Sequence, residues 1–298
     1  MQVGVCLPNY RALASPEAIA RAAGLAEELG FDSVWVTDHV VIPTPYLSRF
    51  GPVFYDPVAT LAYVAGLTRR VRLGTTVLIL SYRNPIVLAK ALATVDQLSG
   101  GRLIFGAAAG WAELEFRALG VPFEERGPRS DEYLALIKAL WTQERPSFQG
   151  RFFSFSDLHF LPRPVQRPHP PIWIGGRSRR ALRRAVEHGD AWHPTFTPPA
   201  QLQQEYQALR EMAAQRGRAT PPALTMRLGV RLGREAVRGD GRQPGTGSAA
   251  QVAEDLRRYA EVGVEHLVLD FPTEEAPELF RAMEVVARAV LPRVRQAP

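Results

Sequence analysis

The stretch VGVCLPNYRALASPEAIARAAGLAEELGFDSVWVT, residues 3–37, decides the predicted fold. It begins with an apolar run at 3–7, of the kind that buried parallel strands require. Residues 15–30 carry apolar side chains at helical spacing, and Ser15-Pro16 opens that segment as a cap followed by a helix-compatible proline. A second apolar run follows at 33–37. The stretch therefore predicts a strand, a helix and a second strand of one parallel sheet.

The same alternation continues along the rest of the chain. Further strands are predicted at 71–80, 103–108, 172–175, 190–193, 224–232 and 266–270. The other helices are predicted at 57–67, 85–98, 130–142, 178–188, 199–216, 248–262 and 276–294. Together these segments make eight strand–helix units, and no glycine-rich dinucleotide turn follows the first strand. We therefore expect an α/β fold, a closed (β/α)8 TIM barrel rather than an open sheet.

One segment interrupts this alternation. Residues 144–171 are rich in Pro, Phe and Arg, and a loop of that length is uncommon inside a compact domain. We interpret the segment as an insertion between the fourth and fifth β/α units, holding a short hairpin around 148–155. The whole chain, 1–298, is assigned to a single domain because eight β/α units need about this length.

The composition indicates the cellular compartment of the protein and excludes some kinds of partner. There are 36 Lys and Arg against 30 Asp and Glu, a net charge of +6, without a basic block long enough for a nucleic-acid arm. The single cysteine, Cys6, excludes internal disulfides, and neither a signal peptide nor a membrane-length apolar run is present. The histidines lack metal-ligand spacing. We expect a cytoplasmic protein that acts on a small molecule, without a metal, membrane or nucleic-acid partner.

Two strand ends carry groups suited to chemistry, since the active site of such a barrel lies at the carboxyl ends of its strands. The second strand ends in Thr37-Asp38-His39, where an acid and an imidazole can orient a ring nitrogen and supply a proton near neutral pH. The same pair can also serve as a structural hydrogen bond or helix cap. The third strand contains Gly74-Thr75-Thr76-Val77-Leu78, which suits either a flat ring against the backbone or a plain apolar strand.

The end of the fourth strand offers space for a ligand, and the end of the fifth strand offers positive charge. Residues 106–111, GAAAGW, clear room for a ligand beside Trp111, or serve helix–strand packing. Residues 175–178, GGRS, precede a helix, so free N–H groups and Arg177 make a competent phosphate cradle. The alternative there is a Ser-capped helix start with a flexible turn.

Several motifs, in order, resemble the luciferase-like monooxygenase superfamily and, within it, the coenzyme F420-dependent oxidoreductases. The motifs are GFDSVWVTDH (30–39), VRLGTTV (71–77), DQLSGGR (96–102), LGVPFEER (119–126) and PIWIGG (171–176). This resemblance implies a barrel with an insertion, usually dimeric, that binds its cofactor at the carboxyl face. We accordingly expect a homodimer.

The resemblance also implies roles for individual residues. Asp38 and His39 match a pair near the reactive part of the deazaflavin. Thr76 and Val77 match a strand bulge, often with a non-proline cis peptide, that supports the ring from behind. The residues that match the loop around the ring are Ala109, Gly110 and Trp111, and those that match the phosphate-binding turn are Gly175, Gly176, Arg177 and Ser178.

The expected function is hydride transfer between F420 and a small organic substrate. His39, oriented or tuned by Asp38, would donate or accept the accompanying proton. Tyr10, Trp111 and Trp192 would form the substrate walls. Because F420 carries a phosphate and a polyglutamate tail, Arg177 and its neighbours on the 178–188 helix would have an acidic partner.

Two alternatives remain open at this point. An FMN-dependent monooxygenase that uses O₂ can occupy the same barrel, since both rings and their phosphates fit similar pockets. A catalytically inactive flavin-binding barrel is the other alternative. Its basis is Ala112, which stands where relatives often have Asn, so that a polar contact to the cofactor or substrate would be missing.

Overall fold

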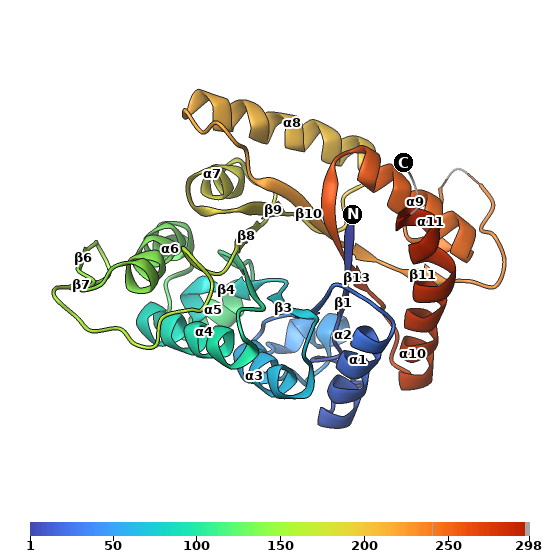
Figure 1. Cartoon of the computed structure of the whole chain (residues 1–298), viewed down its shortest axis with the longest axis horizontal. Helices are drawn as coiled ribbons and strands as arrows, with labels where there is room; N and C mark the ends of the chain where they lie inside the picture. The colour runs from blue at the N-terminus through green and yellow to red at the C-terminus, as the bar shows by residue number, and fades with distance from the viewer. Residues whose placement is uncertain (240, 296–298) are drawn as a thin grey trace.

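Eight parallel strands form a closed barrel in the computed structural model, which describes residues 1–239 and 241–295 (Figure 1). The ring runs β3-β2-β1-β13-β10-β9-β8-β5, and β5 pairs back with β3. This arrangement confirms the predicted (β/α)8 barrel. The strands of the ring are β1 (Gln2–Cys6), β2 (Ser33–Val36), β3 (Arg72–Thr75), β5 (Leu103–Ala108), β8 (Ile172–Gly175), β9 (Ala191–His193), β10 (Ala223–Gly229) and β13 (Val264–Asp270).

Helices surround the barrel and begin where capping residues predict them. Ser15, Asp56 and Asn84 each cap a helix whose first residue is proline, and Ser248 forms a capping box with Gln251. No helix in the described part of the chain is long and apolar enough to cross a membrane. The main helices are α1 (Pro16–Glu28), α3 (Pro57–Leu67), α4 (Pro85–Ser99), α6 (Arg126–Thr142), α7 (Arg179–His188), α8 (Pro199–Gln215), α9 (Ala249–Glu261) and α10 (Ala276–Val285).

Three long predicted elements are divided in the structure. The strand predicted at 71–80 is split into β3 and β4 (Leu78–Ile79) by a cis Thr76–Val77 peptide. The strand predicted at 224–232 ends at Gly229, and β11 (Arg231–Leu232) pairs instead with β12 (Thr246–Gly247). The last helix continues from α10 through a π-helical turn, Val286–Val290, into α11 (Leu291–Arg295). Apolar periodicity does not reveal such breaks.

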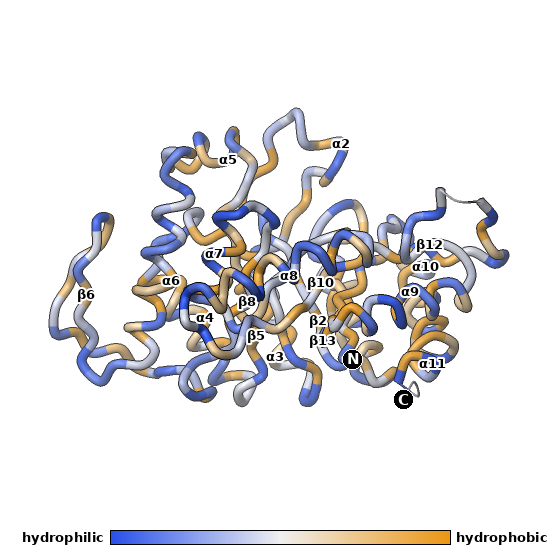
Figure 2. The backbone as a smooth tube through the Cα atoms, turned by 90° about the horizontal axis from the view of Figure 1, so that it is seen from above, coloured by the Kyte–Doolittle hydropathy of each residue, from blue (hydrophilic) through white to orange (hydrophobic). Residues whose placement is uncertain are grey.

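Several short helices at the barrel mouth were not predicted. They are η1 (Thr44–Tyr46), α2 (Leu47–Phe50), η2 (Leu80–Tyr82), α5 (Glu113–Ala118) and η3 (Phe123–Glu125). The segments that hold α2 and α5 project from the same side of the molecule (Figure 2). The Phe50 and Trp111 rings, 6.0 Å apart, bring these two segments into contact.

The 144–171 segment contains the predicted hairpin. Its strands β6 (Phe148–Gln149) and β7 (Ser154–Phe155) pair antiparallel. The hairpin extends from α6 at the end of the molecule opposite α10 and α11 (Figures 1 and 2). That the segment is an insertion stays a prediction, although its place between the fourth and fifth units is the expected one.

Large aromatic side chains fill the inside of the barrel. Trp35 and Trp173 stack there with ring centroids 4.7 Å apart, and both are buried. Gly74 makes room for them, because a Cβ at this position would lie 2.2 Å from the Trp35 ring. This packed interior closes the barrel below the carboxyl ends of its strands. Those ends therefore form the floor of a cavity.

Candidate active site

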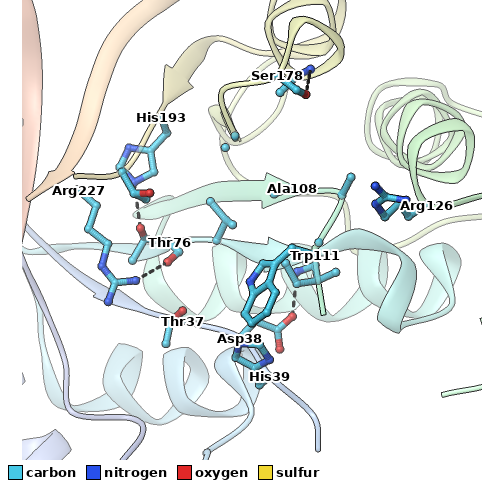
Figure 3. A pocket seen from close by; sticks show the side chains of 18 of the residues that line it. Thr37, Asp38, His39, Thr76, Ala108, Trp111, Arg126, Ser178, His193 and Arg227 are labelled. Carbon is cyan, nitrogen blue, oxygen red and sulfur yellow. Dashed lines mark hydrogen bonds between the residues drawn. The ribbon is translucent and has the colours of Figure 1, made fainter. Parts of the chain in front are cut away.

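A cavity of about 450 Å³ opens at the carboxyl ends of the barrel strands (Figure 3). This volume lies within the range of about 300–1,000 Å³ that small-molecule sites occupy. The described residues contain no cluster of His, Cys, Asp and Glu suited to a metal ion. The predicted site residues that line the cavity are Tyr10, Asp38, His39, Thr76, Val77, Ala109, Gly110, Trp111, Gly175, Gly176 and Ser178.

His39 is held by Glu115, which sequence reasoning missed. The His39 Nδ1 atom lies 2.5 Å from the Glu115 Oε2 atom, and both side chains are buried. Glu115 stands in the first turn of α5, and its Oε1 atom accepts hydrogen bonds from the backbone N–H groups of Val40 and Val41. The carboxylate thus fixes both the imidazole and the backbone that follows it, which leaves Nε2 as the free ring nitrogen of His39.

Glu115 is kept ionised by its hydrogen bonds. Burial acts to raise its pKa, but the bonds from His39 and from the Val40 N–H, with another from the Tyr82 hydroxyl at 2.9 Å, lower that pKa overall. A carboxylate in this state stabilises a positive charge on the neighbouring imidazole. The pair is therefore suited to taking up and returning a proton at the cavity wall.

We expected Asp38 to hold the His39 ring, but within the described residues Asp38 pairs with Arg83. Its two oxygens accept hydrogen bonds from the Arg83 guanidinium at 2.7 and 2.9 Å, and Oδ2 also accepts from the Ile79 N–H. Burial raises the pKa of Asp38, and Arg83 opposes that rise. The expectation that Asp38 orients His39 is wrong, because Glu115 does so. Asp38 instead anchors the chain just after the cis peptide.

The Thr76–Val77 peptide is cis, as the resemblance implied. The Thr76 carbonyl oxygen accepts a hydrogen bond from Arg227 at 3.1 Å, and the Thr76 hydroxyl lies 2.9 Å from His193 Nε2. Burial, together with the nearby His266 and Arg227, lowers the pKa of His193 to about 3. His193 is therefore a neutral hydrogen-bonding group in the cavity lining (Figure 3).

Arg227 is a buried cation on the cavity wall. Its guanidinium pairs with Asp270 at 2.7 Å and donates to the Tyr10 hydroxyl at 3.3 Å. Burial acts to lower the pKa of Arg227, but the nearby Asp270, Cys6 and Tyr10, with the hydrogen bond to Asp270, together raise it above its ordinary value. The ion pair makes this part of the wall close to neutral in net charge.

Trp111 forms an aromatic wall over His39. Its ring centroid lies 6.1 Å from that of His39 in an edge-on arrangement, and the Arg49 guanidinium lies 5.4 Å from the Trp111 ring. The Trp111 side chain is 46% exposed, so it is available to a ligand. Tyr46 and Phe50, from the helices after β2, complete the aromatic group.

The glycine-rich turn after β8 lies across the cavity from His39 (Figure 3). A Cβ at Gly175 would come within 2.9 Å of Val77, and Gly176 has φ +98, so both positions favour glycine. Ser178 caps α7 by accepting from the Ala181 N–H. The turn thus brings the amino end of a ten-residue helix to the cavity.

Two predicted residues do not line the cavity. Arg177 turns away and forms a two-pronged ion pair with Glu205 of α8, whereas Arg180 and Arg184 of α7 do line the cavity. Trp192 is fully buried in the layer between the barrel and the helices, so it is no substrate wall. Successive side chains of a strand point to opposite faces, and because its neighbour His193 faces the cavity, Trp192 faces the helices. Trp192 supports the turn instead, through a 2.8 Å hydrogen bond to the Gly176 carbonyl.

Ala112 also lies away from the cavity. Its side chain is buried, and it occupies the N-cap position of α5, where its carbonyl accepts from the Glu115 and Phe116 N–H groups. A polar residue here would cap the helix. The exchange for alanine therefore gives no sign of a lost cofactor contact.

Sequence reasoning did not assign Arg227, His193 or Glu115 to the site, although the sequence pattern around two of them could have indicated it. Arg227 is a charged residue inside the apolar segment 224–232, which indicates a buried ion pair or a site. His193 ends a predicted strand, at the position where barrel sites lie. Glu115 follows the fourth strand by a few residues, but nothing in the chain indicates that it meets His39, 76 residues earlier.

The chain is similar to enzymes with two kinds of cofactor. The FMNH(2)-dependent dimethylsulfone monooxygenase of Pseudomonas putida is 39% identical over 139 residues, 46% of this chain and 38% of that enzyme. The F420-dependent glucose-6-phosphate dehydrogenase of Kineococcus radiotolerans is 37% identical over 219 residues, 70% of this chain and 63% of that enzyme. The chain therefore spans less than two thirds of the length of either relative.

Solved structures share the fold. An F420-dependent secondary alcohol dehydrogenase, in complex with an F420-acetone adduct, superposes with a TM-score of 0.80 over 99% of both chains at 19% identity. A profile of the family described as luciferase-like monooxygenase matches residues 1–240. This chain belongs to the luciferase-like monooxygenase family, whose members are oxidoreductases and monooxygenases.

Proposed function

We propose that this protein is an F420-dependent oxidoreductase that transfers a hydride between the deazaflavin and a small organic substrate. The observation that carries the proposal is the buried His39–Glu115 pair, with its 2.5 Å contact, at one end of a cavity that has a glycine-rich turn and the amino end of α7 at the other end. The first feature handles a proton, and the second holds a phosphate.

The residues present fit a cofactor that has a phosphate and a flat ring. Gly175 and Gly176 leave the turn free of Cβ atoms, Ser178 begins α7, and Arg126 and Arg180 add positive charge. Small side chains, including Ala108 and Ala109, line the space between this turn and His39. The turn would hold the phosphate, and the Thr76–Val77 segment would support the ring.

The protein residues supply the proton that accompanies the hydride. When bound, the deazaflavin supplies the ring carbon that gives or accepts the hydride. His39 would give its Nε2 proton to a substrate that is reduced, or take the proton from one that is oxidised. Glu115 stabilises the protonated ring and keeps Nε2 turned away from itself. Tyr10 and Trp111 would form the substrate walls.

An FMN-dependent monooxygenase is the second candidate. The Pseudomonas putida relative favours it, and FMN also has a phosphate and a flat ring. We place F420 first because the F420-dependent relative matches 70% of this chain and the FMNH(2)-dependent one 46%. A proton-transferring imidazole also suits hydride transfer to or from a substrate.

Titration of the purified full-length protein with F420 and with FMN separates the two candidates. Quenching of cofactor fluorescence gives each dissociation constant without the need for a substrate. We expect micromolar binding of F420 and weaker binding of FMN. Micromolar binding of FMN alone would overturn the proposal. Turnover with reduced and oxidised F420 over a panel of ketones, enones and alcohols then tests the reaction.

A further inference from the structure

A second cavity of about 320 Å³ adjoins the first at the barrel mouth. Arg11, Phe196 and Asp270 line both cavities, so these residues form the boundary between them. Phe196 is 54% exposed and has φ +51, and the Arg227 guanidinium lies 5.7 Å from its ring. The two cavities therefore adjoin at an exposed phenylalanine side chain.

The walls of the second cavity are held in place. Arg242 and Asp255 form a two-pronged ion pair at 2.6 Å, and Asp255 also accepts from the Gly245 N–H at 2.8 Å. The Arg231 N–H then donates to the Gly245 carbonyl at 2.9 Å. On the other wall, the Tyr259 hydroxyl donates to the carbonyl next to Phe196, that of Thr197, at 2.9 Å. These bonds fix two walls of the second cavity.

The lining combines an apolar interior with a cationic rim. The apolar part consists of Pro198, Leu228, Pro244, Tyr259 and Pro272. The lining holds two arginines that form no ion pair among the residues that the structure describes: Arg11, whose guanidinium donates to the Arg49 carbonyl, and Arg231, which is exposed. The one carboxylate of the lining, that of Asp270, is already paired with Arg227. Such a lining suits an apolar body that ends in an anion.

We propose that this cavity is a substrate subsite for an organic carboxylate. The apolar body of the substrate lies against Leu228 and Tyr259, the carboxylate lies at Arg231, and the reacting end passes Phe196 toward His39. The subsite rests on the proposed function for its role in turnover. The proposed binding of a carboxylate depends only on the residues of the second cavity and not on the cofactor.

Isothermal titration of the full-length protein, without cofactor, with butanoate, hexanoate, octanoate and 1-octanol tests the subsite. Each added methylene should raise the affinity about fourfold, because about 0.8 kcal/mol is gained per buried methylene. Arg231→Gln should weaken octanoate binding about tenfold and leave 1-octanol unchanged, since a charge-assisted hydrogen bond is lost. Gln243→Trp, which fills the cavity from an exposed position, should weaken both probes.

Arg234→Gln is the matched control, because Arg234 is exposed, lies three residues further along and lines a different hollow. It should bind octanoate like the wild type. No octanoate binding, or equal loss in Arg231→Gln and Arg234→Gln, would overturn the subsite. F420 titration of the same variants separates the two proposals. Octanoate binding that depends on Arg231, in a protein that does not bind F420, would support the subsite and reject the F420 assignment.

Discussion

The two ends of the main cavity differ in how their charges are balanced. At the end that holds His39, each buried carboxylate has a cationic or imidazole partner, Glu115 with His39 and Asp38 with Arg83. At the other end, Arg126 and Arg180 line the cavity and form no ion pair within the described residues, whereas Arg184 pairs with Asp131; Glu124 also lines the cavity. The first end thus pairs its buried charges and holds its lining Arg49 against the Phe50 and Trp111 rings, whereas the second end presents Arg126 and Arg180 beside the amino end of α7.

This difference assigns separate tasks to the two ends. A paired imidazole can gain or lose a proton at low cost, because Glu115 compensates the charge. Arginines without a carboxylate partner, next to the amino end of a helix, attract an anion. Changes at the first end should therefore alter turnover, and changes at the second end should alter cofactor affinity.

The largest expected effect is that of His39→Ala. It should lower turnover by about 10²- to 10⁴-fold, the usual contribution of a general acid or base, with little change in F420 affinity. Steady-state kinetics with a substrate from the panel and F420 titration give the two quantities. His159→Ala is the control, since His159 is exposed and outside the cavity lining. Unchanged turnover would remove His39 from the mechanism.

Glu115→Gln should lower turnover by about 10- to 100-fold, because one charge-assisted hydrogen bond to the imidazole is lost. F420 affinity should stay the same, and the pH dependence of kcat should shift. Glu113→Gln, on the same short helix but paired at the surface with Arg117, should change neither. A loss of F420 affinity with an unchanged pH profile of kcat would indicate a merely structural role for Glu115.

At the glycine-rich turn, Arg180→Gln should weaken F420 binding about tenfold, because one charge-assisted contact to the proposed phosphate is lost. Added salt should reduce the difference between variant and wild type, since Arg180 is exposed. Arg177→Gln is the matched control, because Arg177 already pairs with Glu205. An equal loss for both variants would mean that the cofactor does not distinguish these two arginines.

The last prediction concerns stability and not turnover or cofactor affinity, through two buried imidazoles, His193 in the cavity lining and His266 inside the barrel. The pKa of His193 and that of His266 are each lowered to about 3, with burial as the first cause. A lowered pKa in the folded state stabilises the fold above the ordinary histidine pKa, and that stabilisation is lost as the pH falls. The free energy of unfolding should therefore drop by about 1.4 kcal/mol per pH unit for each imidazole between about pH 6.5 and 3.

Urea denaturation over this pH range measures that slope. His266→Gln should make it shallower by the contribution of one imidazole, without a change in F420 affinity, because His266 lies inside the barrel beside Ser33 and Gln2. An unchanged slope would show that His266 is not the group that titrates.

The fold could be predicted from the sequence because each buried strand is a short apolar run and each helix has a periodic apolar face. The starts of α1 and α3 were readable from Ser15-Pro16 and Asp56-Pro57. The short helices that hold Phe50 and Glu115 could not be predicted, since they are too short to show periodicity and depend on tertiary contacts.

The site could be predicted only in part, for a physical reason. Strand ends reveal which residues reach the barrel mouth, and this placed His39, Thr76 and Gly175 correctly on the cavity wall. Pairing partners are decided by contacts between distant segments. Hence the sequence did not show that Glu115 holds His39, nor that Glu205 turns Arg177 away.

A crystal structure of the protein with F420 tests most directly the claim that one end of the cavity transfers a proton and the other binds the cofactor phosphate. We predict phosphate density against the N–H groups of 175–178 and near Arg180, with the ring over Thr76–Val77 and in contact with His39. Phosphate density at Arg11 or Arg231, or a ring remote from His39, would contradict the assignment of the two ends.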